Sequence, residues 1–293
     1  MELVDKLSNR QYIDGEWVES SNKNTRDIIN PYNQETIFTV AEGTKEDVER
    51  AILAARRSFE DGEWSLETSE VRGKKVRAVA DKIKENREEL AKLETLDTGK
   101  TLEESYADMD DIHNVFMYFA GLADKDGGEM INSPIPNTES KIVKEPVGVV
   151  TQITPWNYPL LQASWKIAPA LATGCSLVMK PSEITPLTTI RVFELMEEVG
   201  FPKGTINLVL GAGSEVGDVM SGHEEVDLVS FTGGIETGKH IMKQAANHVT
   251  DVALELGGKN PNIIFDDADF ELAVDQALNG GSVSYTHLRA HET

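Results

Sequence analysis

Val149-Val150-Thr151-Gln152-Ile153-Thr154-Pro155-Trp156-Asn157-Tyr158-Pro159 is the stretch that decides the fold. It begins as a short β-branched run, which is typical of a strand, and it ends in a turn bracketed by two prolines. The residues near 160–173 that follow carry apolar side chains at helical spacing. A strand followed by a helix indicates a βαβ unit and therefore a parallel sheet.

The same alternation continues along the chain. Further short apolar runs occur at 177–179, 206–209, 228–231 and 252–254. Segments with helical spacing separate them, near 186–199, 214–221 and 235–247. We therefore expect an α/β domain built on a Rossmann-type parallel sheet, whose ligands bind at the carboxyl ends of the strands.

The residues before this sheet are predicted to be mostly helical. Thr44-Lys45-Glu46-Asp47 resembles a capping box and would open a helix that runs through Phe59. Two more amphipathic helices are expected around 71–90 and 102–123. After a turn-rich connector, residues 140–145 alternate polar and apolar side chains, which suits an exposed hairpin strand.

Composition excludes several classes of protein. The net charge of −22 argues against nucleic acid as a partner, because phosphate backbones are bound through Lys and Arg. This charge could steer a cationic small molecule toward the protein, or it could serve solubility alone. The sequence has no run of 18 apolar residues and no secretory leader, so we expect neither a membrane span nor export.

The cysteine and histidine content bears on disulfide bonds, the cellular compartment and metal binding. The single cysteine, Cys175, excludes an intramolecular disulfide and indicates a reducing, cytoplasmic compartment. The four histidines outside the last residues form no close pair at helical spacing, so no metal site is predicted.

Polar motifs follow the predicted strands. The Asn157 amide, held on a proline-bracketed turn, can donate to a developing oxyanion, although it could equally stabilise the turn alone. In Lys180-Pro181-Ser182-Glu183, the Lys and Glu can bind ribose hydroxyls, and the carboxylate would repel a 2′-phosphate. Taken alone, that tetrapeptide is a common one.

Glycine-rich motifs follow the later strands. Gly211-Ala212-Gly213-Ser214-Glu215-Val216-Gly217 is one residue longer than the dinucleotide fingerprint. Phe231-Thr232-Gly233-Gly234 directly precedes a helix, where glycines let a phosphate approach free N–H groups. In Leu254-Glu255-Leu256-Gly257-Gly258-Lys259, the Glu lies between apolar residues, so we expect a desolvated carboxylate whose raised pKa suits a general base.

Together these ordered motifs resemble the NAD(P)-dependent aldehyde dehydrogenase superfamily. The resemblance covers residues 8–281 and includes Tyr12-Ile13-Asp14-Gly15-Glu16-Trp17 near the start. Within the superfamily, the sequence is most similar to the bacterial enzymes that oxidise betaine aldehyde to glycine betaine. The family fold implies a cofactor domain with a helical N-terminal portion, a β-hairpin oligomerisation arm, and a catalytic domain that is mostly missing here.

The resemblance also implies residue roles. Asn157 would supply the side-chain part of the oxyanion hole, Glu255 would activate the deacylating water, and Lys166 would give electrostatic support. The expected NAD-binding residues are Ile153, Trp156, Lys180, Ser182, Glu183, Gly213, Gly233, Gly234 and Gly257. The family often has Ser where Gly234 stands, so one hydroxyl contact to phosphate would be missing. Asp97 lies where some members bind a monovalent cation.

The family nucleophile is a cysteine in a Gly-Gln-x-Cys segment, which this sequence lacks. Cys175 leads into a buried strand, so we expect it to be protonated and structural. Residues 282–293 fit neither the period nor the composition before them, and we interpret them as a non-native tail, the alternative being a short natural extension. The chain as written is therefore predicted to be inactive, with its tail mobile.

The substrate is the least readable feature. Tyr158 and Trp165 match aromatics that line the substrate tunnel of betaine-aldehyde enzymes, where a ring face binds a quaternary ammonium. Packing in the core is an equally good interpretation of both residues.

We expect five regions: a helical N-terminal part (1–133), a hairpin arm (134–147), an NAD-binding core (148–262), the start of a catalytic domain (263–281) and the tail (282–293). The predicted function is NAD-dependent oxidation of an aldehyde by a cytoplasmic, homo-oligomeric parent enzyme. The alternatives are another aldehyde or semialdehyde substrate, or a non-catalytic NAD-binding fragment.

Overall fold

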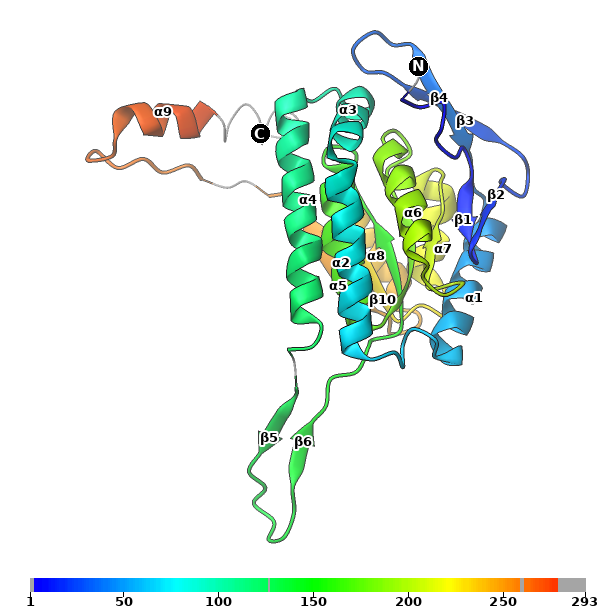
Figure 1. The fold of residues 1–293 in the computed structure, drawn as a ribbon, viewed down its shortest axis with the longest axis vertical. Coiled ribbons are helices and arrows are strands. Elements are labelled where there is room, and N and C mark those ends of the chain that lie inside the picture. Colours follow the sequence, from blue (N-terminus) through cyan, green and yellow to red (C-terminus); the bar gives the residue numbers. More distant parts are fainter. Residues whose placement is uncertain (1–2, 126, 259–260, 279–293) are drawn as a thin grey trace.

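A sheet of seven strands forms the centre of the protein, in the order β11-β10-β7-β8-β9-β1-β2 (Figure 1). The computed structural model describes residues 3–125, 127–258 and 261–278. Five strands are parallel: β7 (Val149–Ile153), β8 (Ser176–Lys180), β9 (Ile206–Leu208), β10 (Leu228–Gly233) and β11 (Asp251–Leu256). The expected parallel sheet is confirmed, and all five of its strands lie where the sequence predicted them.

The N-terminal residues were expected to be mostly helical, and that prediction was wrong for the first 41 residues. They form β1 (Gln11–Ile13) and β2 (Glu16–Val18), which extend the main sheet antiparallel beside β9, and a separate pair, β3 (Thr25–Ile29) and β4 (Thr36–Ala41). The strands β1, β2 and β3 mix polar and apolar residues and so lack the apolar runs that identified the parallel strands. The main sheet is therefore mixed, with antiparallel strands at one edge.

Helices cover both faces of the sheet. One face packs against α2 (Ser69–Glu85), α3 (Arg87–Thr98), α4 (Leu102–Leu122), α5 (Pro159–Thr173) and α6 (Leu187–Val199). The other packs against α1 (Lys45–Asp61), α7 (Asp218–Gly222) and α8 (Ile235–Ala245), with a π-helical turn at Gly213–Gly217 before α7. Adjacent strand residues alternate between these cores: Leu177 and Met179 face the first, and Val178 faces the second.

The start of α1 and the break between α2 and α3 bear on two of the predicted helices. The capping box at Thr44 is present, since Thr44 and Asp47 exchange hydrogen bonds at the start of α1. The single helix expected over 71–90 is instead two helices, α2 and α3, because Asn86 interrupts it. The Asn86 side-chain amide donates to the Lys82 carbonyl at 2.8 Å, which satisfies the end of α2 in place of another turn.

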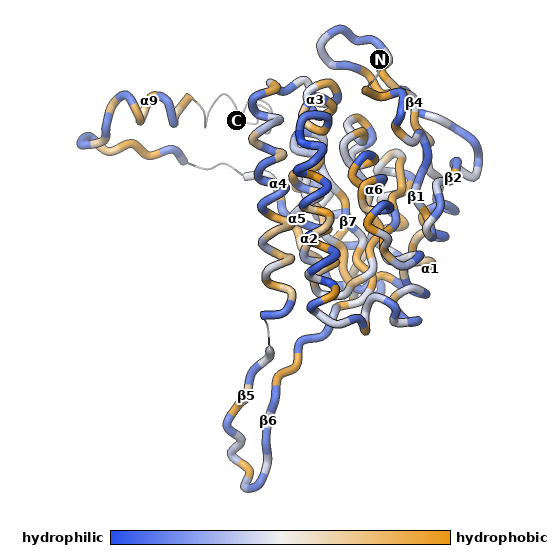
Figure 2. The backbone as a smooth tube through the Cα atoms, viewed as in Figure 1, coloured by the Kyte–Doolittle hydropathy of each residue, from blue (hydrophilic) through white to orange (hydrophobic). Residues whose placement is uncertain are grey.

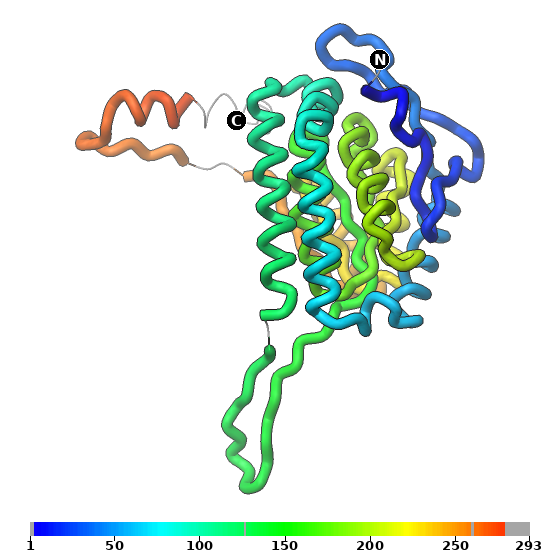
Figure 3. The backbone as a smooth tube through the Cα atoms, viewed as in Figure 1, coloured from blue at the N-terminus to red at the C-terminus, as the bar shows by residue number. Residues whose placement is uncertain are grey.

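A hairpin formed by β5 (Glu129–Ile131) and β6 (Ser140–Ile142) projects away from the body (Figure 3). It begins before residue 134, where the arm was expected to start, because β5 precedes the turn-rich connector. Apolar side chains such as Met130, Ile135 and Val143 are exposed on or beside it. The arm therefore presents unpaired apolar surface, as an assembly element would.

The residues after β11 also leave the body (Figure 1). The segment that leads to α9 (Phe270–Leu278) is strongly apolar around Ile263–Phe265 (Figure 2), and Phe270, Leu272 and Leu278 on the helix are exposed. This confirms the expectation that the helix near 269–279 exposes its apolar face. The tail, residues 282–293, lies outside the described residues. Within the described ranges, no helix is long and apolar enough to cross a membrane.

Candidate active site

The carboxyl ends of four parallel strands lie in register. Lys180 on β8 pairs with Ile153 on β7, Ile153 pairs with Phe231 on β10, and Phe231 pairs with Leu254 on β11. The motifs that follow these strands therefore emerge at one edge of the sheet. The chain runs from β7 toward β8 and β9 on one side and toward β10 and β11 on the other. Ligands of α/β sheets bind at such a switch point, here between β7 and β10.

Lys180 and Glu183 form an ion pair at the end of β8. The Lys180 side chain is 2% exposed, and its Nζ donates to Glu183 Oε2 at 3.1 Å and to the Pro181 carbonyl at 3.0 Å. Burial lowers the pKa of Lys180, an effect that Glu183 opposes. Burial also raises the pKa of Glu183, but Lys180, its hydrogen bonds and Arg26 outweigh that and leave the pKa below its usual value. Glu183, one-third exposed, is thus an ionised acceptor at the surface.

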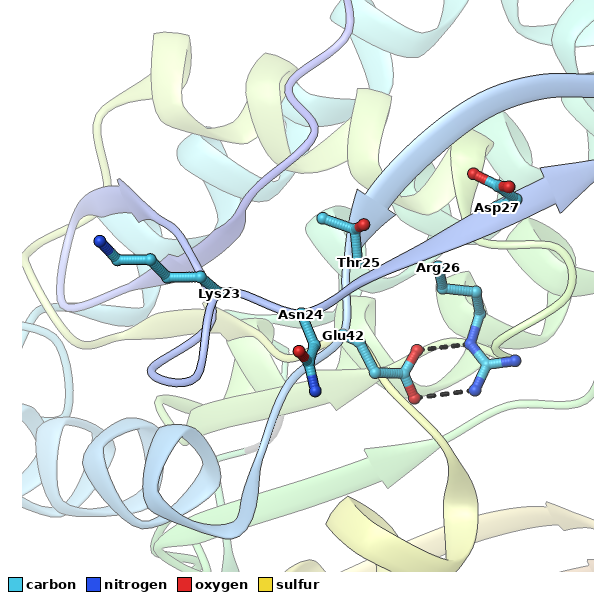
Figure 4. A pocket seen from close by; sticks show the side chains of 6 residues that line it. All are labelled: Lys23, Asn24, Thr25, Arg26, Asp27 and Glu42. Carbon is cyan, nitrogen blue, oxygen red and sulfur yellow. Dashed lines mark hydrogen bonds and ion pairs between the residues drawn. The ribbon is translucent and has the colours of Figure 1, made fainter.

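A narrow hollow, too small to admit a water molecule, adjoins this pair. Its lining includes Ser182, Glu183, Gly211 and the pair Arg26–Glu42 from β3 and the end of β4. Figure 4 shows the two parallel bonds from the Arg26 guanidinium to the Glu42 carboxylate. Arg26 and Glu42 were missed by the sequence analysis, because nothing in the local sequence links residues 26 and 42 to a motif 140 residues away.

The turn after β7 carries Asn157. Ile153 is buried at the strand end, Trp156 is 45% exposed, and the Trp156 carbonyl accepts from Thr185 Oγ1 at 3.0 Å. The Oδ1 atom of Asn157 is buried and has no hydrogen-bond partner among the described residues. A buried amide oxygen left unpaired by the protein can accept a hydrogen bond from a ligand, since such groups are otherwise satisfied.

Glycines line the other strand ends. A Cβ on Gly233 would lie 2.4 Å from the Phe231 ring, so a larger residue there requires that ring to move. Gly234 is the N-cap of α8 without a side-chain capping bond, and a Cβ there would meet open space. The Gly257 amide donates to the Gly233 carbonyl at 3.3 Å, which joins the ends of β10 and β11. Gly213 is exposed at the start of the π-helical turn.

Lys166 on α5 reaches the sheet from the same side as Glu255. Its Nζ donates to Ser230 Oγ at 3.0 Å, and burial lowers the pKa of Lys166 to about 8, with Glu255 acting in the opposite direction. Thr232 is the cross-strand partner of Glu255, and Ser230 lies two residues before it on the same face. Lys166 and Glu255 are therefore electrostatic neighbours.

The expected desolvation of Glu255 was wrong for the described residues. Glu255 is exposed, because β11 is the outermost strand and only its other face, with Leu254 and Leu256, packs against a core. The apolar neighbours along the sequence point to the opposite side of the strand, so they do not bury the carboxylate.

The two candidate substrate aromatics differ in environment. Tyr158 is half-buried, and the Lys100 Nζ lies 4.1 Å from the centre of its ring. Burial raises the pKa of Tyr158, and Asp108 and Glu104 add to the shift. Trp165 follows seven residues later on the same face of α5 and is 50% exposed, so the core-packing interpretation does not describe it.

Asp97, the candidate cation ligand, is buried. Its Oδ2 accepts from the Leu187 amide at 2.9 Å, and Oδ1 has no partner within the described part of the chain. Burial raises the pKa of Asp97 well above its usual range. The carboxyl group is therefore one that a bound cation would favour in its charged form.

Cys175 lies at the opposite edge of the sheet from Asn157. It directly precedes Ser176, which pairs with Val149 at the amino end of β7, whereas Asn157 follows the carboxyl end. The thiol is 3% exposed and contacts Thr173 Oγ1 at 3.5 Å. The prediction that Cys175 leads into a buried strand is confirmed. The five residues of β8 separate it from the candidate site.

The chain belongs to the aldehyde dehydrogenase family, whose sequence pattern matches residues 17–285. Among curated relatives, it is similar to a betaine aldehyde dehydrogenase of Bacillus subtilis, with 66% identity over 273 residues that cover 93% of this chain and 56% of the relative. A betaine aldehyde dehydrogenase of Oryza sativa is 46% identical over 275 residues, which cover 92% of this chain and 54% of the relative. The chain thus spans about half the length of the curated relatives it matches.

Solved structures agree with this assignment. A crystal structure of betaine aldehyde dehydrogenase from Staphylococcus aureus in complex with NAD⁺ is 91% identical and superposes with a TM-score of 0.94, covering 96% of this chain and 56% of that one. The mixed α/β architecture described above is therefore about half of the aldehyde dehydrogenase fold.

Proposed function

We propose that this chain is the cofactor-binding part of an NAD-dependent aldehyde dehydrogenase whose substrate is betaine aldehyde. The observation that carries the proposal is the register of β8, β7, β10 and β11, which gathers Lys180, Asn157, Gly233 and Glu255 at one edge of the sheet. The similarity to bacterial betaine aldehyde dehydrogenases supports the same substrate class.

The residues fit a dinucleotide. Glu183 is an ionised acceptor for ribose hydroxyls, and the buried Lys180 beside it is a donor. Gly233 and Gly234 leave the N-terminus of α8 open to a phosphate, whose charge the helix N-terminus favours. When bound at this edge, NAD would supply the hydride acceptor for oxidation of the aldehyde. The π-helical turn, with Gly213, would border the same ligand.

The chain's own residues would then position and polarise the substrate. The Asn157 amide would donate to the aldehyde oxygen as negative charge develops on it. Glu255 would take a proton from water, with the Lys166 ammonium as its electrostatic neighbour. The exposed face of β11 that carries Glu255 requires a further covering element before the carboxylate is desolvated.

The division into regions follows the same proposal. The body up to residue 262 would be the NAD-binding part, the segment with α9 would begin the catalytic domain, and the exposed hairpin arm would pair with other copies in a homo-oligomer. Residues 282–293 would be non-native.

The polypeptide as written would not perform the reaction. Covalent catalysis by this family needs an activated thiolate within reach of the aldehyde and of Asn157. The one cysteine in the sequence, Cys175, is buried at the other edge of the sheet. A non-catalytic NAD-binding fragment is the second candidate function, and it is favoured for this chain alone by that placement.

The experiment compares two proteins in an assay of NADH formation. The 293-residue chain is expected to give no aldehyde-dependent NADH. A chain in which a continuation carrying Gly-Gln-x-Cys replaces residues 282–293 is expected to oxidise betaine aldehyde. A Cys175→Ser variant of the longer protein is the control and should keep its activity. Turnover by the short chain that Cys175→Ser abolishes would refute the proposed site.

A further inference from the structure

The hollow beside Glu183 contains a second carboxylate that no family motif predicts. Glu42 follows β4 and lines this hollow together with Arg26, Ser182 and Glu183. Its carboxylate is 21% exposed and faces the Arg26 guanidinium, which is 35% exposed (Figure 4). Residues that lie more than 130 positions apart therefore meet at the point where the proposed function places the adenosine ribose.

The Arg26–Glu42 pair uses the Nε–Nη2 edge of the guanidinium group. Arg26 Nε donates to Glu42 Oε2 at 2.5 Å, and Nη2 donates to Oε1 at 2.8 Å. Such a bidentate geometry is the one that guanidinium groups also offer to phosphates. Glu42 thus occupies the position on Arg26 that an incoming phosphate would otherwise take.

The pair is also anchored to the site. Glu42 Oε1 accepts from the Ala212 amide at 3.1 Å, in the loop after β9 that contains Gly211 and Gly213. The bond to Glu42 is the main cause of the raised pKa of Arg26, and Glu183 raises it too, so the three charges interact. The two carboxylates, Glu42 and Glu183, balance the two cations, Arg26 and Lys180.

We propose that Glu42 is a specificity-determining residue that disfavours NADP by neutralising Arg26 and adding negative charge beside Glu183. The inference rests on the proposed function, because it needs the ribose near Glu183. The neutral 2′-hydroxyl of NAD is indifferent to this arrangement. A 2′-phosphate on a ribose held by Glu183 would lie beside two carboxylates, Glu183 and Glu42, and the Nε–Nη2 edge of Arg26 is already bonded to Glu42.

The test measures binding to the 293-residue chain by calorimetry. The ligands are NAD, NADP, 5′-AMP and adenosine 2′,5′-bisphosphate, the last two probing the ribose without the nicotinamide. Glu42→Gln keeps an oxygen for the Ala212 amide but removes the charge. It is expected to improve binding of the two 2′-phosphorylated ligands by about tenfold, as one freed charge-assisted bond allows, and to leave NAD and 5′-AMP within about threefold.

Two variants serve as controls. Glu225→Gln makes the same chemical change in another Glu–Arg pair, in which Arg56 lies 3.0 Å from Glu225 near the amino end of β10. This variant should change the affinity for none of the four ligands. In the double variant Arg26→Gln/Glu42→Gln, the improved affinity for the 2′-phosphorylated ligands should disappear, because the guanidinium that binds the phosphate is absent. The improved affinity of Glu42→Gln for these ligands should also become smaller as salt is added, because salt screens the charges.

Each outcome is decisive. If Glu42→Gln keeps NAD binding but gains nothing for NADP, the inference is wrong and the proposed function stands. If Glu42→Gln loses NAD and 5′-AMP binding while its unfolding temperature is unchanged, Glu42 supports the site directly and the inference is also wrong. If the folded unmodified chain binds none of the four ligands, the proposed function is wrong, and the inference that rests on it is wrong too.

Discussion

The ammonium group of Lys100 lies 4.1 Å from the centre of the Tyr158 ring, over one of its faces. The side chain of Lys100 is 8% exposed, and its Nζ is also 2.5 Å from Asp108 Oδ2 and 3.7 Å from Glu94 Oε1. Tyr158 follows Asn157 and caps α5. A buried ionic cluster from α3 and α4 therefore holds the residue next to the candidate oxyanion donor, and one ring face is already occupied by a cation.

The first prediction concerns this cluster. Lys100→Met is expected to destabilise the protein by about 3–5 kcal/mol, because it leaves buried carboxylates without their cation. Burial already raises the pKa of Glu94 and of Asp108, so in the variant both take up protons more readily. The loss should thus be smaller at pH 5 than at pH 7. Urea unfolding at both pH values measures it.

Lys74→Met is the matched control. Lys74 pairs with Glu70 at 2.6 Å, but both side chains are about 70% exposed, so little stability is expected to be lost. Equal losses in Lys100→Met and Lys74→Met would show that the cluster around Tyr158 contributes no more than a surface pair.

The second prediction is a pH dependence at Lys166. Its pKa is lowered by burial from 10.5 to about 8 in the folded protein. Between these values the unfolded chain binds more protons, so the stability contributed at this position rises with pH from about 8 to about 10.5. The stability advantage of Lys166→Met over the unmodified chain should therefore shrink across that window.

Denaturant unfolding at pH 7.5, 9 and 10 would measure this difference. Lys243→Met, which removes an exposed lysine on α8, should show no such change with pH. A flat difference for Lys166→Met would mean that Lys166 does not experience the desolvation that its burial implies.

The third prediction concerns Gly234. Gly234→Ser adds a hydroxyl at the N-cap of α8, where a Cβ meets open space and φ is −72°. A hydrogen bond from that hydroxyl to a charged phosphate should tighten NAD binding by roughly threefold to tenfold. Titration with NAD tests this. Gly121→Ser on α4, another position with open space, is the control. Unchanged affinity in Gly234→Ser would place the pyrophosphate elsewhere.

The fourth prediction is a stabilising substitution. Val249 follows α8 with φ of 57° and is 89% exposed, although β-branched residues rarely adopt this left-handed conformation. Val249→Asn should stabilise the protein by about 1 kcal/mol, since Asn tolerates this region. Thermal unfolding measures the change, with Val143→Asn on the hairpin arm as the control. A loss of stability would show that the Val249 side chain makes a contact worth more than the strain.

The sequence predicted the parallel strands well because each is a short apolar run followed by a helix with clear spacing. Lys180, Asn157, Gly233 and Glu255 were each identified from a motif at a strand end, and the pairing of the strands brought them to one edge. Local sequence could not predict Lys100 or Glu42, whose partners come from other elements. It also misjudged Glu255, since burial depends on what covers β11 and not on the residues beside it.

If the carboxyl ends of the parallel strands form a site for NAD, the 293-residue chain should bind it, and calorimetric titration with NAD measures this binding. We expect saturable binding of one NAD per chain, weakened by Lys180→Met, and weaker binding of NADP. The control Lys45→Met replaces an exposed lysine at the start of α1 and should not change the affinity. No binding of NAD by a chain that unfolds cooperatively, or equal binding of NAD and NADP, would contradict the account.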